Sequence, residues 1–241
     1  RTEYSAEMHW DLVREVTNIA VGPESSEAVK LKAQQAFRKA WNYDLIWNVL
    51  IFGEEFGNIR TKMGHAEYAQ LEGHNFNNSV SCPFKTPEQV LAFDPVETYG
   101  TKNKKELIKR FEADYEYFCQ HFPDAVNMTG IYITCISGLI EIFGWDMMLM
   151  AMGTDQQKFG LLTNRYAQWI QQYYEALAES NVPVVMLHDD ITWTSGPFAH
   201  PDWYREYVFP NYKKFVSPLL EAGKKVLFTS DGDYTVFIDD I

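Results

Sequence analysis

The chain has 241 residues, of which 21 are Lys or Arg and 33 are Asp or Glu, so its formal net charge is −12. With 46% hydrophobic and 22% charged residues it has the composition of a globular protein, which excludes a disordered or low-complexity chain. The shortage of basic residues disfavours nucleic acids and anionic membranes as partners, because phosphate binding depends on Lys and Arg.

The three cysteines are widely separated and form no C-x-x-C pair, as expected for reduced thiols inside a cell. The most apolar stretch, 131–152, contains Glu141 and Asp146, so we expect no membrane-spanning segment. No charged-then-apolar leader follows Arg1. We therefore place the protein in the cytoplasm.

The first half of the chain predicts helices, one strand and an irregular segment. Residues 1–42 repeat apolar residues at near-helical spacing and form a helical N-terminal segment. The run 44–51 is short and continuously apolar, which is typical of a strand buried on both faces. Residues 57–85 scatter Gly, Asn and His among aromatics and predict an irregular excursion. Thr86 and Asn103 are placed to cap the next two helices.

From residue 124 onward, strands and helices alternate. The predicted elements are a strand at 126–134, a helix at 137–151, an amphipathic helix capped by Thr154 and Gln157, a strand at 182–187, a helix from Pro201 towards Glu221, a strand at 225–228 and a helix from Asp233. The amphipathic helix carries an apolar stripe that we assign to the core: Leu161, Leu162, Tyr166, Trp169, Ile170, Tyr173 and Leu177.

Short apolar strands separated by helices predict the α/β class and parallel βαβ units. We expect a single domain over 1–241 with the (β/α)₈ TIM barrel architecture. A closed barrel needs eight strands, and four are convincing: those beginning at Asp44, Val126, Val182 and Lys225. Either the chain is incomplete or the barrel is not closed. Because the sequence ends at Ile241 inside an expected helix, we expect a barrel that is incomplete at its C-terminus.

Polar side chains gather at two of the predicted strand ends. His188, Asp189 and Asp190 follow one strand, where they could bind a metal, hold a polar or cationic substrate group, or transfer protons. Side chains alternate along a strand, so only one of the two aspartates should point inward. The alternative is that one caps a helix or turn and the other is solvated. The second cluster, 229–233, is equally compatible with a site or with an Asp-Gly turn.

Other signals are weaker. Nucleotide-binding, zincin and nucleophile-elbow motifs do not occur in the sequence. His65 and His74 could be metal ligands, although loop histidines are more often solvated. Trp193 could offer a flat face to an aromatic substrate or could equally serve packing. Tyr132 is a further candidate for contact with a substrate.

The stretch HDDITWTSGPFAHPDWYREYVFPNYKKFVSPLLEAGKKVLFTSDGD (188–233) resembles the uroporphyrinogen decarboxylase superfamily. In that superfamily an Asp-Asp strand end is followed by a Gly, a Pro-started helix, an aromatic-Pro-x-Tyr segment and a strand ending in a polar Gly turn. Looser matches are YDLIWNVL (43–50), MGHAEY (63–68), AFDPVETYG (92–100) and MTGIYITCISGLIEIFGWDMMLMAMGTDQ (128–156). The resemblance covers about 43–241 and implies a (β/α)₈ barrel with its cleft at the carboxyl ends of the strands.

The superfamily holds two relevant activities, cofactor-free decarboxylation of uroporphyrinogen and zinc-dependent methyl transfer between a substrate and a corrinoid protein. The Arg-rich segment of the decarboxylases is missing, because Arg1, Arg14 and Arg38 stand alone. The resemblance therefore favours a methyltransferase acting between a small methylated substrate, of methoxylated aromatic or methylamine type, and a corrinoid protein that carries methylcobalamin. Uroporphyrinogen decarboxylation and a catalytically silent ligand-binding barrel are the alternatives, and a homodimer is compatible with each.

The methyltransferases of this superfamily carry a zinc-ligating His-x-Cys at the strand end where Thr229 and Asp231 stand here. Hydroxyl and carboxylate oxygens are harder ligands than imidazole and thiolate, so we expect weak zinc binding or none. Any divalent metal ion should have oxygen ligands, with Asp231 joined by His188 or Asp189. If no metal is bound, protonation of the leaving group by a carboxylic acid would be needed.

The resemblance and the two clusters together give a set of candidate site residues. Asp189, Asp190 and Asp231 are the candidate catalytic residues. The residues expected to contact the substrate are His188, Trp193 and Tyr132.

Overall fold

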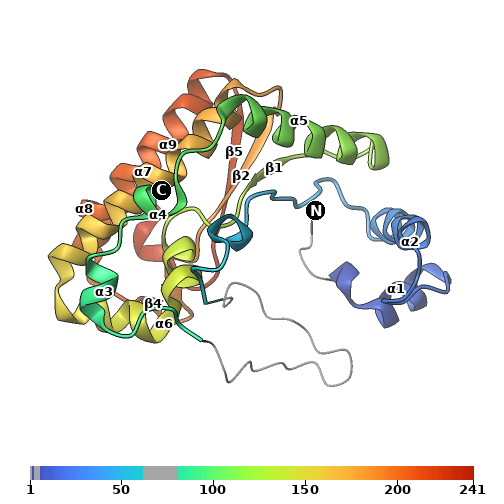
Figure 1. Ribbon diagram of the computed structural model, residues 1–241. Coiled ribbons are helices and arrows are strands. Elements are labelled where there is room, and N and C mark those ends of the chain that lie inside the picture. Colours follow the sequence, from blue (N-terminus) through green and yellow to red (C-terminus); the bar gives the residue numbers. More distant parts are fainter. Residues whose placement is uncertain (1, 3–5, 62–80) are drawn as a thin grey trace.

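The computed structural model describes residues 2, 6–61 and 81–241. The N-terminal segment is helical, as predicted, with the 3-10 turn η1 (Ala6–Met8) and helices α1 (Trp10–Thr17) and α2 (Glu27–Ala40). These helices have a small hydrophobic core of their own, formed by Val13, Val21, Ala33 and Phe37. They lie on the opposite side of the sheet from α7, α8 and α9 (Figure 1).

The central sheet is parallel, which confirms the α/β prediction. Its strands β1 (Thr129–Ile131), β2 (Val184–His188) and β5 (Lys225–Thr229) lie in the order β1-β2-β5. The segment 45–51 runs parallel to β1 on its free side. The four predicted strand regions are therefore adjacent in chain order.

The segment 45–51 pairs less regularly than predicted. It is joined to the chain around β1 by two isolated parallel bridges, Leu45 to Val126 and Ile51 to Ile131. Its burial is mixed, with Ile46, Val49 and Ile51 buried and the residues between them half-buried, so burial of both faces is less complete than predicted. Its edge position accounts for the incomplete pairing, because only one side of the segment meets another strand in the described part of the chain.

The helices have the following bounds: α3 (Pro87–Leu91), α4 (Pro95–Tyr99), α5 (Lys104–His121), α6 (Ile136–Thr154), α7 (Gln156–Glu179), α8 (Pro201–Tyr207) and α9 (Phe209–Glu221). Short turns η2 (Gly53–Phe56) and η3 (Thr235–Phe237) and the hairpin β3 (Thr192–Trp193) with β4 (Gly196–Pro197) complete the elements of the described residues. Thr86 and Asn103 cap α3 and α5 as predicted.

Three helix predictions need correction. The helix expected from Pro201 is two helices, because Pro210 has no N–H for the preceding turn and the chain breaks at Val208. Asp155 rather than Thr154 caps α7, since its carboxylate accepts from Lys158 N at 2.9 Å. The helix expected from Asp233 is only the 3-10 turn η3. Of the predicted excursion 57–85, the described ends 57–61 and 81–85 contain no helix or strand.

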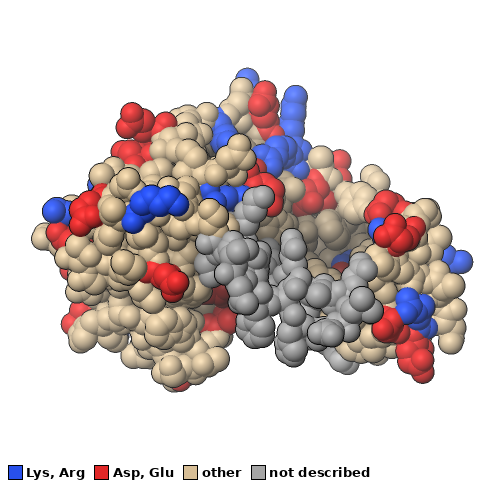
Figure 2. Space-filling view, turned by 60° about the horizontal axis from the view of Figure 1, so that its bottom comes forward, with Lys and Arg blue, Asp and Glu red and all other residues tan. Residues whose placement is uncertain are grey.

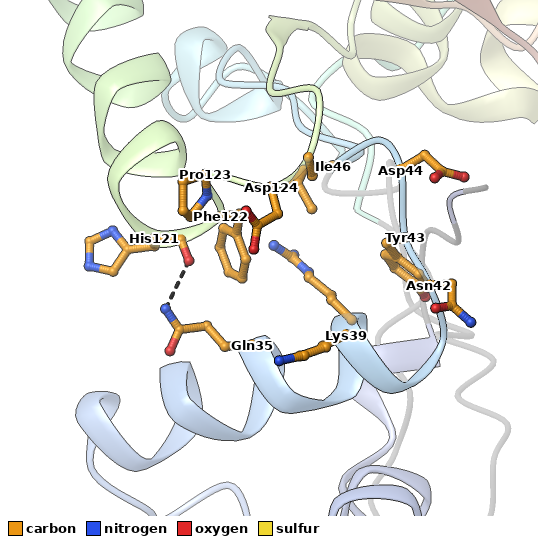
Figure 3. A pocket seen from close by; sticks show the side chains of 12 residues that line it. Gln35, Lys39, Asn42, Tyr43, Asp44, Ile46, His121, Phe122, Pro123 and Asp124 are labelled. Carbon is orange, nitrogen blue, oxygen red and sulfur yellow. Dashed lines mark hydrogen bonds between the residues drawn. The ribbon is translucent and has the colours of Figure 1, made fainter.

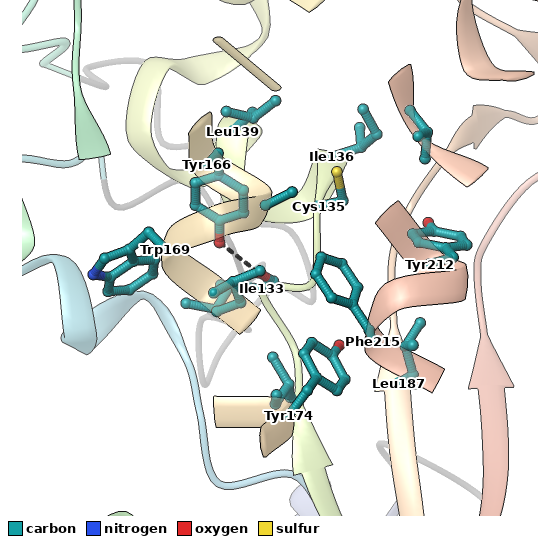
Figure 4. Close-up of a cluster of buried hydrophobic side chains, with 14 of the residues drawn as sticks. Ile133, Cys135, Ile136, Leu139, Tyr166, Trp169, Tyr174, Leu187, Tyr212 and Phe215 are labelled. Atoms are coloured by element: carbon teal, nitrogen blue, oxygen red, sulfur yellow. Dashed lines mark hydrogen bonds between the residues drawn. The ribbon is translucent and has the colours of Figure 1, made fainter. Parts of the chain in front are cut away.

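The main core lies between the sheet and helices α6, α7 and α9, and buried tyrosines within it bind backbone carbonyls or polar side chains (Figure 4). Tyr166 Oη donates to Ile133 O at 2.5 Å, and the Tyr174 ring stacks on Phe215 at 4.6 Å. The predicted stripe on α7 is buried in this core except Leu161, which is 49% exposed because it lies on the flank of the stripe. Helix α6 is long and apolar enough to cross a membrane, and 67% of its most apolar window is buried within the protein.

The end of α2 meets the end of α5 across a hollow of about 420 Å³ (Figure 3). Gln35 Nε2 donates to His121 O at 2.8 Å, and the Arg38 guanidinium lies 4.1 Å from the centroid of the Phe122 ring. Arg38 also donates two hydrogen bonds to the carboxylate of Glu7. These contacts hold the N-terminal helices against α5.

Candidate active site at the carboxyl end of the sheet

A cavity of about 860 Å³ opens at the carboxyl ends of the parallel segments. Each of the four segments contributes a lining residue within two positions of its end: Phe52, Tyr132, Asp190 and Asp231. The facing wall comes from the N-terminal helices and the last turns of α5, with Glu7, Arg38, Tyr117, Phe118 and Phe122 among its residues. Ligands of parallel α/β folds bind at this end of the strands.

The two adjacent aspartates point in different directions. Asp189 is fully buried and does not line the cavity. Its carboxylate accepts from Ile136 N at 3.0 Å, Ser137 N at 2.6 Å and Tyr212 Oη at 2.5 Å. The two backbone donors belong to the first turn of α6, where N–H groups have no partner inside the helix. Asp189 therefore fixes the start of α6 to the end of β2.

Burial raises the pKa of Asp189, and the hydrogen bonds from Tyr212, Ser137 and Ile136 oppose that shift. A carboxylate enclosed in this way has no path to a ligand in the cavity. The geometry therefore gives Asp189 a positioning role, in place of the catalytic role expected from the sequence.

Asp190 faces the cavity and pairs with His188. Its Oδ1 lies 3.3 Å from His188 Nε2, and its backbone N–H donates to Ser137 Oγ at 2.8 Å. Burial lowers the pKa of His188, but the hydrogen bond and charge of Asp190 outweigh burial and hold that pKa above its ordinary 6.5. Asp190 therefore favours the protonated form of His188.

An aromatic stack forms the wall beside this pair. The Tyr132 ring lies 3.9 Å from the His188 ring at 9° between planes, and the Phe52 ring lies 5.5 Å from Tyr132 at 28°. His188 Nδ1 also lies 3.1 Å from Tyr132 O. His188 itself is behind this wall, since the cavity is lined by Tyr132 and Phe52.

Asp231 is exposed in the turn after β5, and its backbone N–H donates to Asp190 Oδ1 at 3.1 Å. The turn needs glycine at the next position. Gly232 has a φ of +84°, and a Cβ there would lie 2.5 Å from Trp193 O. The structure thus brings Asp190 and Asp231 together, although about 40 residues of chain separate the clusters that contain them.

Trp193 lies outside the lining of the cavity. Its ring is 5.7 Å from Trp145 and 6.0 Å from Phe198, and it is 44% exposed. Packing in this aromatic group, one of the two roles considered from the sequence, accounts for its position.

The described residues do not offer a metal site. No group of three His, Cys, Asp or Glu side chains in 6–61 and 81–241 is arranged to hold a metal ion. Both ring nitrogens of His188 already have partners. Thr229, at the position where the resemblance expects a histidine ligand, has a buried hydroxyl without a hydrogen-bond partner among the described residues. His65 and His74 lie outside the described residues.

Three contributors to the site were not identified from the sequence. Tyr212 is the last residue of the Phe-Pro-Asn-Tyr run that carries part of the resemblance. The sequence therefore marked this tyrosine but did not indicate its hydrogen bond to Asp189. Ser137 binds Asp189 and Asp190 from a helix start more than fifty residues earlier. Arg38 was considered only as an arginine without arginine neighbours in the sequence, and its pairing with Glu7 was not predicted.

No known protein family matches the chain, and no curated protein matches it by sequence. A methyltransferase from Methanosarcina mazei is similar in structure, with a TM-score of 0.56 and 14% sequence identity. The similarity covers 95% of this chain and 64% of that chain, so this chain spans less than two thirds of its neighbour's length. At this identity the similarity shows a shared fold.

Proposed function

We propose that the chain is a methyltransferase that takes a methyl group from a small substrate in the 860 Å³ cavity and delivers it to a corrinoid held by a partner protein. The observation that carries the proposal is the pair Asp190 and Asp231, which meet at the carboxyl end of a parallel sheet. A methyltransferase of known structure has the same fold. We also propose that the sheet belongs to a (β/α)₈ barrel, whose strands would keep this order.

In this proposal the chain's own residues bind and orient the substrate. Asp190 and Asp231 supply negative charge at the strand ends, and Tyr132 and Phe52 supply a rigid apolar wall that excludes water on one side. Asp189 holds the end of β2 in place. The cobalt of the corrinoid would accept the methyl group, and no step is assigned to a metal ion held by this chain, because the described donor set does not fit one.

The test is methylcobalamin formation from cob(I)alamin with a panel of methyl donors. We expect product with the unaltered chain and about a hundredfold less with Asp190→Asn, because a charge beside the reacting group contributes a few kcal/mol. Asp239→Asn is the matched control, since Asp239 is exposed and does not line the cavity. Equal rates for the Asp190 variant and the control would refute the proposal.

A catalytically silent ligand-binding barrel is the second candidate, favoured by Thr229 and Asp231 in place of the His-x-Cys ligands. Uroporphyrinogen decarboxylation is less favoured, because Arg38 is the single described basic residue lining the cavity and is bound to Glu7. Formation of coproporphyrinogen would support decarboxylation. Ligand binding without either product would support the silent barrel.

A further inference from the structure

The charge of the cavity indicates which ligands it favours. Among its described lining residues are four carboxylates, Glu7, Glu54, Asp190 and Asp231, and one guanidinium, Arg38. The guanidinium is compensated by Glu7, with both side chains almost buried. In the space-filling view, acidic residues also lie on both halves of the visible face (Figure 2). The described lining of the cavity is therefore negative, which favours a cation and disfavours a carboxylate or phosphate.

The four carboxylates are not equally available to a ligand. Glu54 lies 3.1 Å from Arg60, and Asp190 pairs with His188. Asp231 is exposed and makes no ion pair with the described residues. A cation entering the cavity can thus meet the carboxylate of Asp231 without displacing a basic side chain of the described ranges.

Aromatic side chains dominate the remaining walls. Six of them line the cavity: Trp47, Phe52, Tyr117, Phe118, Phe122 and Tyr132. Aromatic faces attract organic cations through the ring quadrupole, and aromatic rings around a carboxylate form the typical recognition site for a quaternary ammonium group. A small hydrated ion would gain little from these walls, because it would have to give up its water to apolar rings.

We infer that this cavity recognises a quaternary ammonium group bearing N-methyl groups, with Asp231 as its counter-ion and Phe52 as its aromatic contact. A second part of the inference rests on the proposed function: the same cation is the methyl donor.

The chemistry of a quaternary ammonium methyl donor is compatible with the side chains of the site. Breaking the C–N bond leaves its electron pair on nitrogen, which departs as a neutral tertiary amine. The methyl carbon forms its new bond with an electron pair supplied by the Co(I) of the corrinoid acceptor, whose oxidation state rises by two. No proton moves, so Asp190 and Asp231 act through charge alone, as ionised carboxylates.

Binding tests the inference independently of methyl transfer. The probe is choline, compared by calorimetry with 3,3-dimethylbutan-1-ol, its uncharged carbon isostere. We expect choline to bind at least about tenfold more tightly than the isostere, and Asp231→Asn to weaken choline binding about five- to tenfold. Phe52→Leu should weaken it by a similar factor, while Asp239→Asn leaves it unchanged, with circular dichroism verifying the fold of each variant.

Equal affinity for choline and the isostere, or unchanged choline affinity in Asp231→Asn, would overturn the inference. The failure of the proposed function has a different signature. Selective choline binding without methylcobalamin formation from any quaternary ammonium donor would refute the methyltransferase and leave the cation site standing. Methyl transfer from an uncharged methoxylated donor, without selective choline binding, would refute the cation site and leave the methyltransferase standing.

Discussion

Removal of the Tyr212 hydroxyl should destabilise the protein in a pH-dependent way. In Tyr212→Phe the buried carboxylate of Asp189 loses its 2.5 Å donor and keeps two backbone donors, from Ile136 and Ser137. A hydrogen bond to a charged group contributes about 1.5–3 kcal/mol, and Asp189 is fully buried, so water does not replace the lost donor. We expect the free energy of unfolding to fall by about 2–3 kcal/mol at pH 8.

The sign of the pH dependence follows from the pKa of Asp189. Burial raises this pKa above the ordinary 3.8, and the Tyr212 hydrogen bond opposes that shift. The folded form therefore binds a proton more readily than the unfolded chain, so stability falls as pH rises through the folded pKa. Without the Tyr212 donor the folded pKa rises further. The loss of stability in Tyr212→Phe should therefore shrink as the pH is lowered, because protonation relieves the under-bonded carboxylate.

Urea unfolding followed by circular dichroism at pH 8 and pH 5 measures both effects. Tyr234→Phe is the control, since the Tyr234 hydroxyl makes no hydrogen bond within the described ranges and its ring packs on Phe228. A fall in the free energy of unfolding of less than about 0.5 kcal/mol at pH 8 would refute the reasoning, because a hydrogen bond to a charged group contributes more than this. So would a loss that grows as the pH is lowered.

The remaining predictions concern the turn, the ion pair and the metal. Gly232→Ala should lower the free energy of unfolding, measured in urea, by about 1–3 kcal/mol and should weaken choline binding. Gly223→Ala, also at positive φ but with open space around the added Cβ, should cost about 1 kcal/mol and leave binding unchanged; equal effects of the two would contradict the close approach of Trp193 O to Gly232. Asp190→Asn should lower the pKa of His188 in an NMR titration, since Asp190 holds that pKa above 6.5. The stabilisation of the fold by this pair is present below pH 6.5 and is lost as the pH rises through the folded pKa of His188. An unchanged titration of His188 would contradict the pairing. Elemental analysis should find no stoichiometric zinc, and zinc retained in Asp231→Ala would show that a site lies elsewhere.

The order of the strands could be predicted because each depends on local signals. The runs at 182–187 and 225–228 are short, apolar and followed by polar clusters, and both form strands close to these bounds. The caps at Thr86 and Asn103 were predicted equally well, since a cap depends on residues within three positions. At 44–51 the same apolar signal gave the direction of the segment but not its incomplete pairing.

The direction of each aspartate could not be predicted, because it depends on distant parts of the chain. Alternation indicated that one of Asp189 and Asp190 would turn inward, but not which one. The choice is made by Ser137 and Tyr212, which supply donors on the core side only. The aromatic wall facing the sheet was not predicted either, because it depends on how α5 and the N-terminal helices pack.

The small separate core of the N-terminal helices has a consequence for engineering. Val13, Ala33 and Phe37 pack among themselves, while Asp190 and Asp231 belong to the sheet. The wall that faces the sheet and the charged ends of the strands thus belong to segments that a designer can exchange independently. Libraries that graft foreign helical pairs onto the unaltered sheet, with the Gln35 contact to α5 retained, should yield folded chimeras with altered substrate profiles.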